Sequence, residues 1–118
     1  MSESANKDNM FMGPAFTQAV KLSCQEDVNT LLSQSTFYVC KYIFLSVNNS
    51  VDVNNADSGT HWSLLFVNRT SSEAYHLDSM AGVNRKSAHE VALKIGIMEG
   101  SIFEIPCYQQ KQWFRVWV

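Results

Sequence analysis

Cysteine is scarce in this sequence, positive charge is not in excess, and no apolar run is long. The three cysteines are Cys24, Cys40 and Cys107. An odd number at irregular spacing speaks against a disulfide framework or a zinc site and for a reducing compartment. Nine basic residues against eleven acidic ones give a net charge of −2. Without a basic stripe, nucleic acid is not expected as a partner.

Long apolar segments are also missing. The longest runs, such as Tyr42–Val47 and Leu64–Val67, are too short to cross a bilayer, so no membrane partner is expected. Residues 1–10 are polar and lack the apolar core of a secretory signal. We therefore expect a location in the cytoplasm, the nucleus or both.

The length of 118 residues fits one domain, and its content of 46% hydrophobic and 17% charged residues is typical of a globular chain. We expect a monomer without a cofactor or a metal. The predicted elements, in order, are a flexible leader over residues 1–10, helices over Pro14–Ser23 and Gln25–Ser33, a strand over Phe37–Val47 that is strongest from Tyr42, a polar loop over Asn48–Gly59, strands over His61–Val67 and Glu73–Ser79 joined by a turn over Arg69–Ser72, a helix over Asn84–Met98 and a strand over Ser101–Ile105. The pattern is α+β.

The segment His61–Val67 carries apolar residues on both faces of the predicted strand. Leu65 and Val67 fall on one face of the predicted strand, and Trp62, Leu64 and Phe66 fall on the other. Such a strand is expected to be buried on both faces and to lie centrally in a sheet.

The chemistry of the sequence centres on His61 and Asp78. If the two strands form a hairpin, residue 61 pairs close to residues 78–80, and cross-strand Cβ atoms are about 5 Å apart. A carboxylate there would orient the imidazole and stabilise the imidazolium that forms when a thiol or hydroxyl loses its proton. The pair is the base-and-orienter part of a hydrolytic triad. It could equally be an ordinary structural pair.

Two other histidines have weaker claims. His76 has the opposite strand parity to Leu77 and is predicted to face away from the site, whereas His89 lies on the predicted helix with no partner in view. We interpret both as structural or solvent-facing.

The run Gly59-Thr60-His61-Trp62-Ser63-Leu64-Leu65, then Asp78-Ser79, a helix, a short strand and Gln109-Gln110, resembles the ubiquitin-like-protein-specific cysteine proteases, the sentrin/SUMO protease family. The loop followed by this motif is most similar to the deneddylase branch, which acts on the neddylation modifier. The resemblance runs from about Met10 to Gln110. It implies a papain-like α+β fold, incomplete at both ends, with residues 11–118 forming a partial protease domain.

By this resemblance, His61 is the general base and Asp78 the acid that orients it. Gln110 is the side-chain donor of the oxyanion hole, a type of group that contributes several kcal/mol to catalysis. Trp62 lines the channel for the Gly-Gly tail of a ubiquitin-like modifier, although its position alone fits a core residue equally well. The implied partners are the neddylation modifier, or alternatively SUMO, and their conjugates.

The nucleophile is where the sequence departs from the family. The family follows its glutamine with a polar stretch, an aromatic residue and Asp-Cys-Gly. An ungapped comparison matches Phe114 with the aromatic residue, but Arg115, Val116 and Trp117 stand at the three motif positions. Sliding the tail removes the motif altogether, and the family's upstream Trp-containing segment is also missing.

Three readings follow from the missing nucleophile. The first is a truncated or alternatively spliced protease product without activity, and it is the one we favour. The second is a pseudoprotease that binds a ubiquitin-like modifier. The third keeps activity through another thiol, with Cys107 the strongest candidate.

Overall fold

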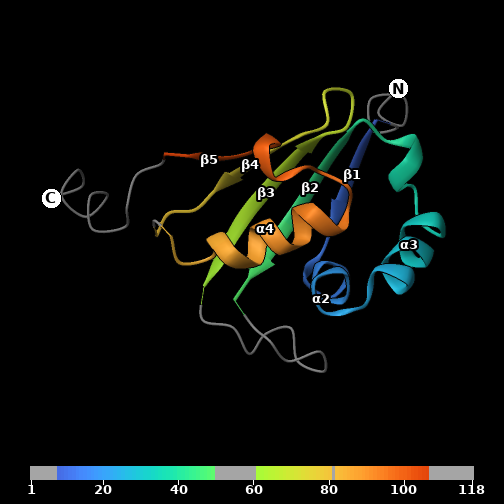
Figure 1. The fold of residues 1–118 in the computed structure, drawn as a ribbon, viewed down its shortest axis with the longest axis horizontal. Helices are drawn as coiled ribbons and strands as arrows, with labels where there is room; N and C mark the ends of the chain where they lie inside the picture. The colour runs from blue at the N-terminus through green and yellow to red at the C-terminus, as the bar shows by residue number, and fades with distance from the viewer. Residues whose placement is uncertain (1–7, 50–60, 81, 107–118) are drawn as a thin grey trace, which may run out of the picture.

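The computed structural model describes residues 8–49, 61–80 and 82–106 (Figure 1). Its elements, in chain order, are strand β1 (Asn9–Met12), helices α2 (Pro14–Leu22) and α3 (Gln25–Ser33), the 3-10 helix η1 (Phe37–Val39), strands β2 (Tyr42–Asn48), β3 (Trp62–Asn68) and β4 (Glu73–Leu77), helix α4 (Arg85–Lys94), the 3-10 helix η3 (Glu99–Ser101) and strand β5 (Ile102–Ile105). The predicted α+β class is confirmed.

The five strands form one mixed sheet in the order β1-β2-β3-β4-β5. Strands β2, β3 and β4 are antiparallel neighbours, whereas β1 pairs parallel with β2 and β5 pairs parallel with β4. Parallel pairing requires a crossover, and these crossovers contain α2 and α3 at one edge and α4 at the other. Strand β3 is central, as its sequence predicts.

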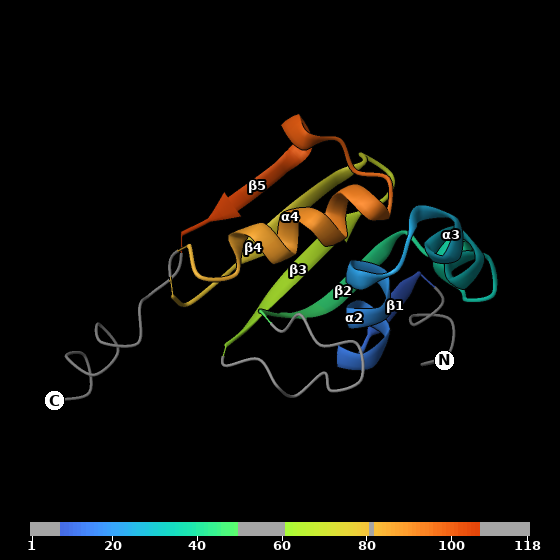
Figure 2. The same ribbon diagram turned by 60° about the horizontal axis from the view of Figure 1, so that its bottom comes forward.

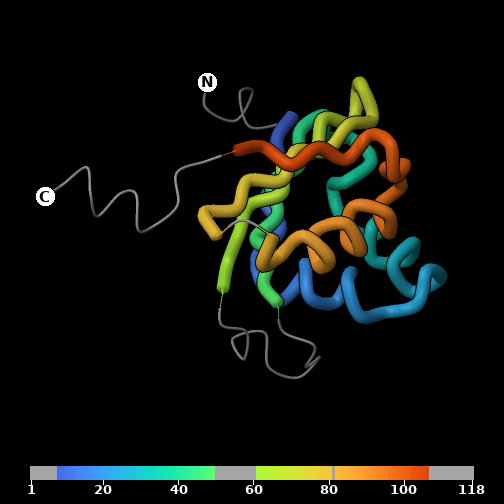
Figure 3. The backbone as a smooth tube through the Cα atoms, turned by 60° about the vertical axis from the view of Figure 1, so that its left-hand side comes forward, coloured from blue at the N-terminus to red at the C-terminus, as the bar shows by residue number. Residues whose placement is uncertain are grey.

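The helices cover a single face of the sheet. In Figure 2, α4 crosses the middle of the strands and α2 lies beside β1 and β2. Figure 3 shows the helices gathered on one side of the strands. Alternate residues of β2 and β3 on this covered face are fully buried, among them Ile43, Leu45, Leu65 and Val67. The core therefore lies between the sheet and α2 and α4.

The opposite face of the sheet is open among the described residues. Trp62 is 41% exposed and Leu64 is 39% exposed. The prediction that this strand is buried on both faces is therefore wrong. Continuous apolar patterning gives β3 its central place, but helices bury only one of its faces.

Two further expectations differ from the structure. The segment predicted as a strand from Phe37 begins with η1 instead, and the strand itself starts at Tyr42. The guanidinium group of Arg69 lies over the Phe37 ring and donates to the carbonyls of Phe37 and Cys40, which holds the segment in a turn. At the other edge, α4 ends at Lys94, four residues earlier than predicted.

Part of the predicted leader belongs to the sheet. Asn9 and Met10 lie in β1, where they pair with Tyr42 and Ile43. The carbonyl of Asp8 accepts hydrogen bonds from the backbone N–H groups of Lys41 and Tyr42. Residues 1–7 lie outside the described residues.

Candidate active site

The β3–β4 hairpin places His61 beside Asp78. Its turn spans residues 69–72, as predicted, and the side-chain oxygen of Asn68 fixes it by accepting from the N–H groups of Thr70 and Ser71. Leu64 pairs with Leu77, so continuing the register by one step sets Asp78 opposite Ser63. His61 is then the diagonal neighbour of Asp78, within reach of a long side chain. The predicted proximity is confirmed.

The two side chains form a hydrogen bond. Nε2 of His61 contacts Oδ1 of Asp78, and the two residues are 9% and 5% exposed. Such burial removes most competing water, so the contact between them is stronger than a surface ion pair. The carboxylate is therefore well placed to orient the imidazole ring.

Asp78 is held as a carboxylate. Burial raises the pKa of its carboxyl group, but the hydrogen bond with His61, the N–H groups of Met80 and Asn84 and the charge of His61 outweigh burial, and the pKa is lowered from 3.8. The two N–H donors lie 2.9 and 3.0 Å from its oxygens. Asp78 consequently carries the negative charge that an orienting acid requires.

The second ring nitrogen of His61 is available for proton transfer. Among the described residues, Nδ1 has no hydrogen-bond partner, because Nε2 makes the contact with Asp78. An imidazole with one nitrogen on a carboxylate and the other free is the base of a hydrolytic triad. A nucleophile activated by this histidine would have to lie next to Nδ1.

Asn84, a third residue that the sequence does not single out, contacts both members of the pair. Asn84, which immediately precedes α4, is fully buried. Its backbone N–H donates to Oδ2 of Asp78, and its side-chain amide lies 3.2 Å from the carbonyl oxygen of His61. The only signal in the sequence is an asparagine directly before a helix, which is common at helix starts.

His76 lies on the same face as Asp78, so the prediction that it faces away from the site is wrong. Residues 76 and 78 share strand parity, and His76 is fully buried. Its Nε2 lies 2.7 Å from the hydroxyl oxygen of Ser63, and its Nδ1 lies 2.8 Å from Glu104. Its structural role is as expected.

The carboxylate of Glu104 also contacts His89, the other histidine with a weak claim to the site. Glu104 lies 3.1 Å from Nε2 of His89, and Nδ1 of His89 lies 3.3 Å from Glu99. His89 therefore has two partners that the sequence did not reveal, and both are contributed by the segment that follows α4. This pairing ties the outer side of α4 to η3 and β5.

The remaining expected site residues divide into two groups. Trp62 follows His61 but points to the open face, where it is 41% exposed and available for contact. Gln110, the expected oxyanion donor, and Cys107, the strongest alternative thiol, both lie outside the described residues. The role of Gln110 stays a prediction.

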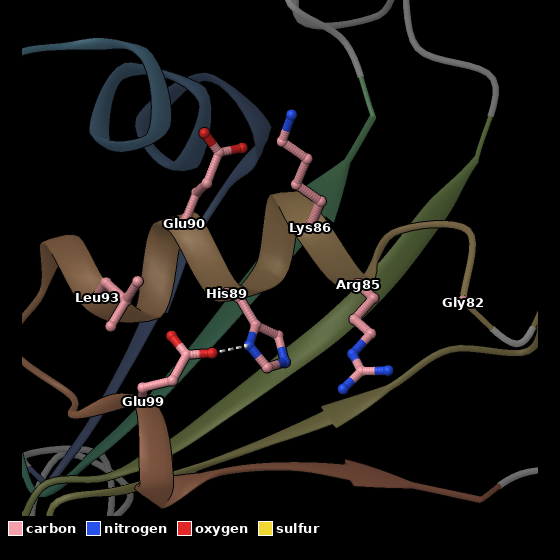
Figure 4. Close-up of a pocket in the computed structure, with 7 residues that line it drawn as sticks. All are labelled: Gly82, Arg85, Lys86, His89, Glu90, Leu93 and Glu99. Carbon is pink, nitrogen blue, oxygen red and sulfur yellow. Dashed lines mark hydrogen bonds and ion pairs between the residues drawn. The ribbon is translucent and has the colours of Figure 1, made fainter.

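A shallow hollow of about 480 Å³ lies on the outer side of α4 (Figure 4). Arg85, His89 and Glu99 are among its lining residues, but His61 and Asp78 are not. The hollow is therefore separate from the candidate catalytic pair.

In the described part of the chain, no three His, Cys, Asp or Glu side chains are arranged to hold a metal ion, and no helix is long and apolar enough to cross a membrane.

The sequence comparisons decide the family. Residues 3–100 match the model of the Ulp1 protease family, C-terminal catalytic domain. The chain belongs to the Ulp1 protease family. Membership in the ubiquitin-like-protein-specific cysteine proteases, expected from the His-Trp and Asp-Ser motifs, is confirmed, and the mixed sheet with its helices agrees with the papain-like fold of that family.

Individual relatives of this Ulp1-family chain carry the same assignment. The chain is 32% identical to sentrin-specific protease 8 of Rattus norvegicus over 92 residues, which is 77% of this chain and 42% of the relative. It is 30% identical to sentrin-specific protease 8 of Homo sapiens over 86 residues, covering 72% of this chain and 40% of the relative. The aligned part thus corresponds to about two fifths of each relative's length.

Proposed function

We propose that this chain carries the general-base half of a deneddylase-like active site and has no protease turnover by itself. His61 would take the proton of a thiol nucleophile at Nδ1, and Asp78 would hold the ring and stabilise the imidazolium. The observation that carries the proposal is the buried contact of Nε2 with Asp78, which leaves Nδ1 free among the described residues. The family membership supplies the reaction class.

Neither cysteine in the described residues can serve His61. Cys40 precedes β2, whose first residue pairs with the last residue of β3, so one strand length of about 20 Å separates it from His61. Cys24 lies at the start of α3, next to the C-terminal end of α4, about 15 Å along that helix from Asn84. The exposed Cys24 is a free thiol, which fits the reducing cytoplasm or nucleus that we propose as the location.

The direct test is a cleavage assay with the complete chain. A fluorogenic C-terminal amide of the neddylation modifier is the first substrate, the matching SUMO derivative is the second, and an active sentrin-specific protease is the positive control. We expect no turnover, because loss of a nucleophile costs about a million-fold in rate in a hydrolytic triad. Turnover that disappears in His61→Ala would contradict the proposed inactivity.

A thiol-reactive version of the modifier tests the third reading. A modifier whose C-terminus carries an electrophile should form no covalent adduct with the chain. An adduct that is lost in Cys107→Ser and also in His61→Ala would assign Cys107 as the nucleophile. An adduct that persists in His61→Ala would indicate chemistry unrelated to the pair.

The alternative function is a pseudoprotease that binds a ubiquitin-like modifier. Trp62 favours it, because this large ring is 41% exposed directly beside the buried His61. Amide NMR of the labelled chain, with and without the neddylation modifier, measures binding directly. Trp62→Ala should weaken the affinity for the modifier, measured from these shifts, at least tenfold. The matched change Tyr38→Ala, at a different site where the ring is 53% exposed, should leave the affinity unchanged. Equal affinity of the two variants would remove Trp62 from the binding surface.

A further inference from the structure

We propose that Asn84 is the positioning residue of the candidate active site, holding His61 and Asp78 in the geometry that proton transfer needs. This inference rests on the proposed role of the pair as base and orienting acid. Asn84 is fully buried and contacts both members, His61 through its side chain and Asp78 through its backbone.

The side-chain amide of Asn84 gathers the ends of two strands. Its Nδ2 lies 3.1 Å from the carbonyl oxygen of Val47, 3.2 Å from that of His61 and 3.1 Å from the hydroxyl oxygen of Ser63. Two amide hydrogens are thus shared among three acceptors. Val47 lies near the end of β2 and His61 directly before β3, so the amide ties both chain segments together where the catalytic histidine sits.

The orientation of this amide follows from its partners. Two of the three are carbonyl oxygens, which can only accept, so the NH₂ group must face them and the oxygen must face the other way. That oxygen, Oδ1, is a buried side-chain atom with no hydrogen-bond partner among the described residues. Burying an unpaired amide oxygen is unfavourable, so the three contacts of the NH₂ group must offset that cost.

The backbone of Asn84 acts on the other member of the pair. Its N–H group donates to Oδ2 of Asp78 at 3.0 Å, while Oδ1 of the same carboxylate contacts Nε2 of His61. Residues directly before a helix normally use their side chain to bond the first helical N–H groups. The side chain of Asn84 makes no such bond and reaches the strands instead.

Asn84 therefore connects three segments that are distant in sequence. The end of β2, the start of β3 and the turn after β4 meet at this one residue, and α4 begins directly after it. Without the amide, the backbone of His61 loses its link to the turn that carries Asp78. The distance between the imidazole and the carboxylate would then depend on their mutual contact and on the two backbone N–H groups that hold the carboxylate.

The test uses signals of the pair itself in the complete labelled chain. The first is the pKa of the Asp78 carboxyl group, followed by carbon NMR as a function of pH. The second is the downfield proton resonance of the hydrogen bond between His61 and Asp78. Arg69→Ala is the matched control, because Arg69 also donates to two backbone carbonyls but does so at the far end of β3.

We expect Asn84→Ala to raise the pKa of Asp78 from its lowered value toward or above 3.8 and to abolish the downfield resonance. Arg69→Ala should reduce stability and leave both signals unchanged. Asn84→Ser keeps one hydrogen-bond donor in a smaller side chain and should restore part of the resonance. A folded Asn84→Ala variant with both signals intact would overturn the proposal.

Unfolding of both Asn84 variants, while Arg69→Ala remains folded, would also overturn it and would make Asn84 a residue of the fold alone. These signals require neither a nucleophile nor a modifier. Turnover in the cleavage assay would therefore refute the proposed function without affecting the assignment of Asn84. Conversely, loss of the assignment would leave the result of that assay unchanged.

Discussion

The hydroxyl oxygen of Ser63 lies 2.7 Å from Nε2 of His76. Because Glu104 contacts the other nitrogen of that ring at 2.8 Å, the three residues have the connectivity of a serine, histidine and acid triad. His76, however, is fully buried, and the Ser63 oxygen already accepts from the side chain of Asn84. The connectivity of the hydrogen bonds alone therefore does not make a catalytic site. Access to the nucleophile is also needed.

We predict that Ser63 does not react with a fluorophosphonate probe. Its hydroxyl, on a half-buried residue, is engaged by the fully buried His76 and by Asn84, so it is not free to attack the probe in the folded chain. Intact-mass measurement after incubation should show the unmodified chain, with an active serine hydrolase as the positive control. An adduct mapped to Ser63 that is absent in His76→Ala would show that this serine is a nucleophile.

His76→Ala should lower the free energy of unfolding by about 2–4 kcal/mol, because it removes a fully buried ring and its hydrogen bonds with Ser63 and Glu104. The matched change is His89→Ala, which removes the other histidine bound to Glu104 but at a side chain that is 16% exposed. We expect that change to cost about 1 kcal/mol or less. Urea titration of both variants measures the difference, and equal costs would contradict a buried structural role for His76.

Asp78→Asn should destabilise the fold in a pH-dependent way. The folded pKa of Asp78 is lowered from 3.8, so its charged form contributes stability that is present above that value and is lost as pH falls through the lower folded pKa. At neutral pH the expected loss is about 1.5–3 kcal/mol, typical of hydrogen bonds to charged groups.

The measurement is urea unfolding of the wild type and Asp78→Asn between pH 7 and pH 2. The difference between them should shrink below pH 4, as the carboxyl group of the wild type takes up its proton. A difference that persists unchanged down to pH 2 would mean that the pair is not held by a carboxylate.

The hairpin and its pair were predictable because they depend on local chain geometry. Four polar residues after Asn68 specify the turn, the strand period fixes which residues share a face, and His61 and Asp78 follow. The same parity argument, applied to residues 76 and 78, places His76 on the face of Asp78. The prediction that His76 faces away from the site came from comparing it with Leu77 instead. The family motifs indicated the reaction class independently of the register.

Features that depend on distant contacts were not predictable. The aromatic segment at Phe37 has the composition of a strand, and only the position of Arg69 over its ring explains the turn found there. Asn84 similarly gains its role from the ends of β2 and β3, which one sequence does not place beside it. The uncovered sheet face could not be foreseen, since periodicity reports apolar character and not what packs on it.

That open face carries a row of five aromatic rings, one from each strand. The rings are in register, and neighbouring centroids lie 4.9, 5.0, 6.2 and 5.4 Å apart; in strand order they are Phe11, Phe44, Phe66, Tyr75 and Phe103. Phe11 is 74% exposed and Phe103 is 39% exposed. An apolar surface of this extent is unusual on a monomeric domain and should bind apolar molecules.

We therefore expect the folded chain to enhance the fluorescence of an anilinonaphthalene dye and the double change of Phe44 and Phe66 to Thr to reduce that enhancement severalfold. Threonine preserves strand propensity, so the loss of ring contacts should cost only about 1–2 kcal/mol of unfolding free energy. Leu65→Ala is the opposite control, since it removes a fully buried side chain on the covered face. It should cost about 2–5 kcal/mol without reducing dye binding under conditions that keep the chain folded. If the dye responded to Leu65→Ala and not to the double change, it would be reporting loosened core packing, and the aromatic row would not be the binding surface.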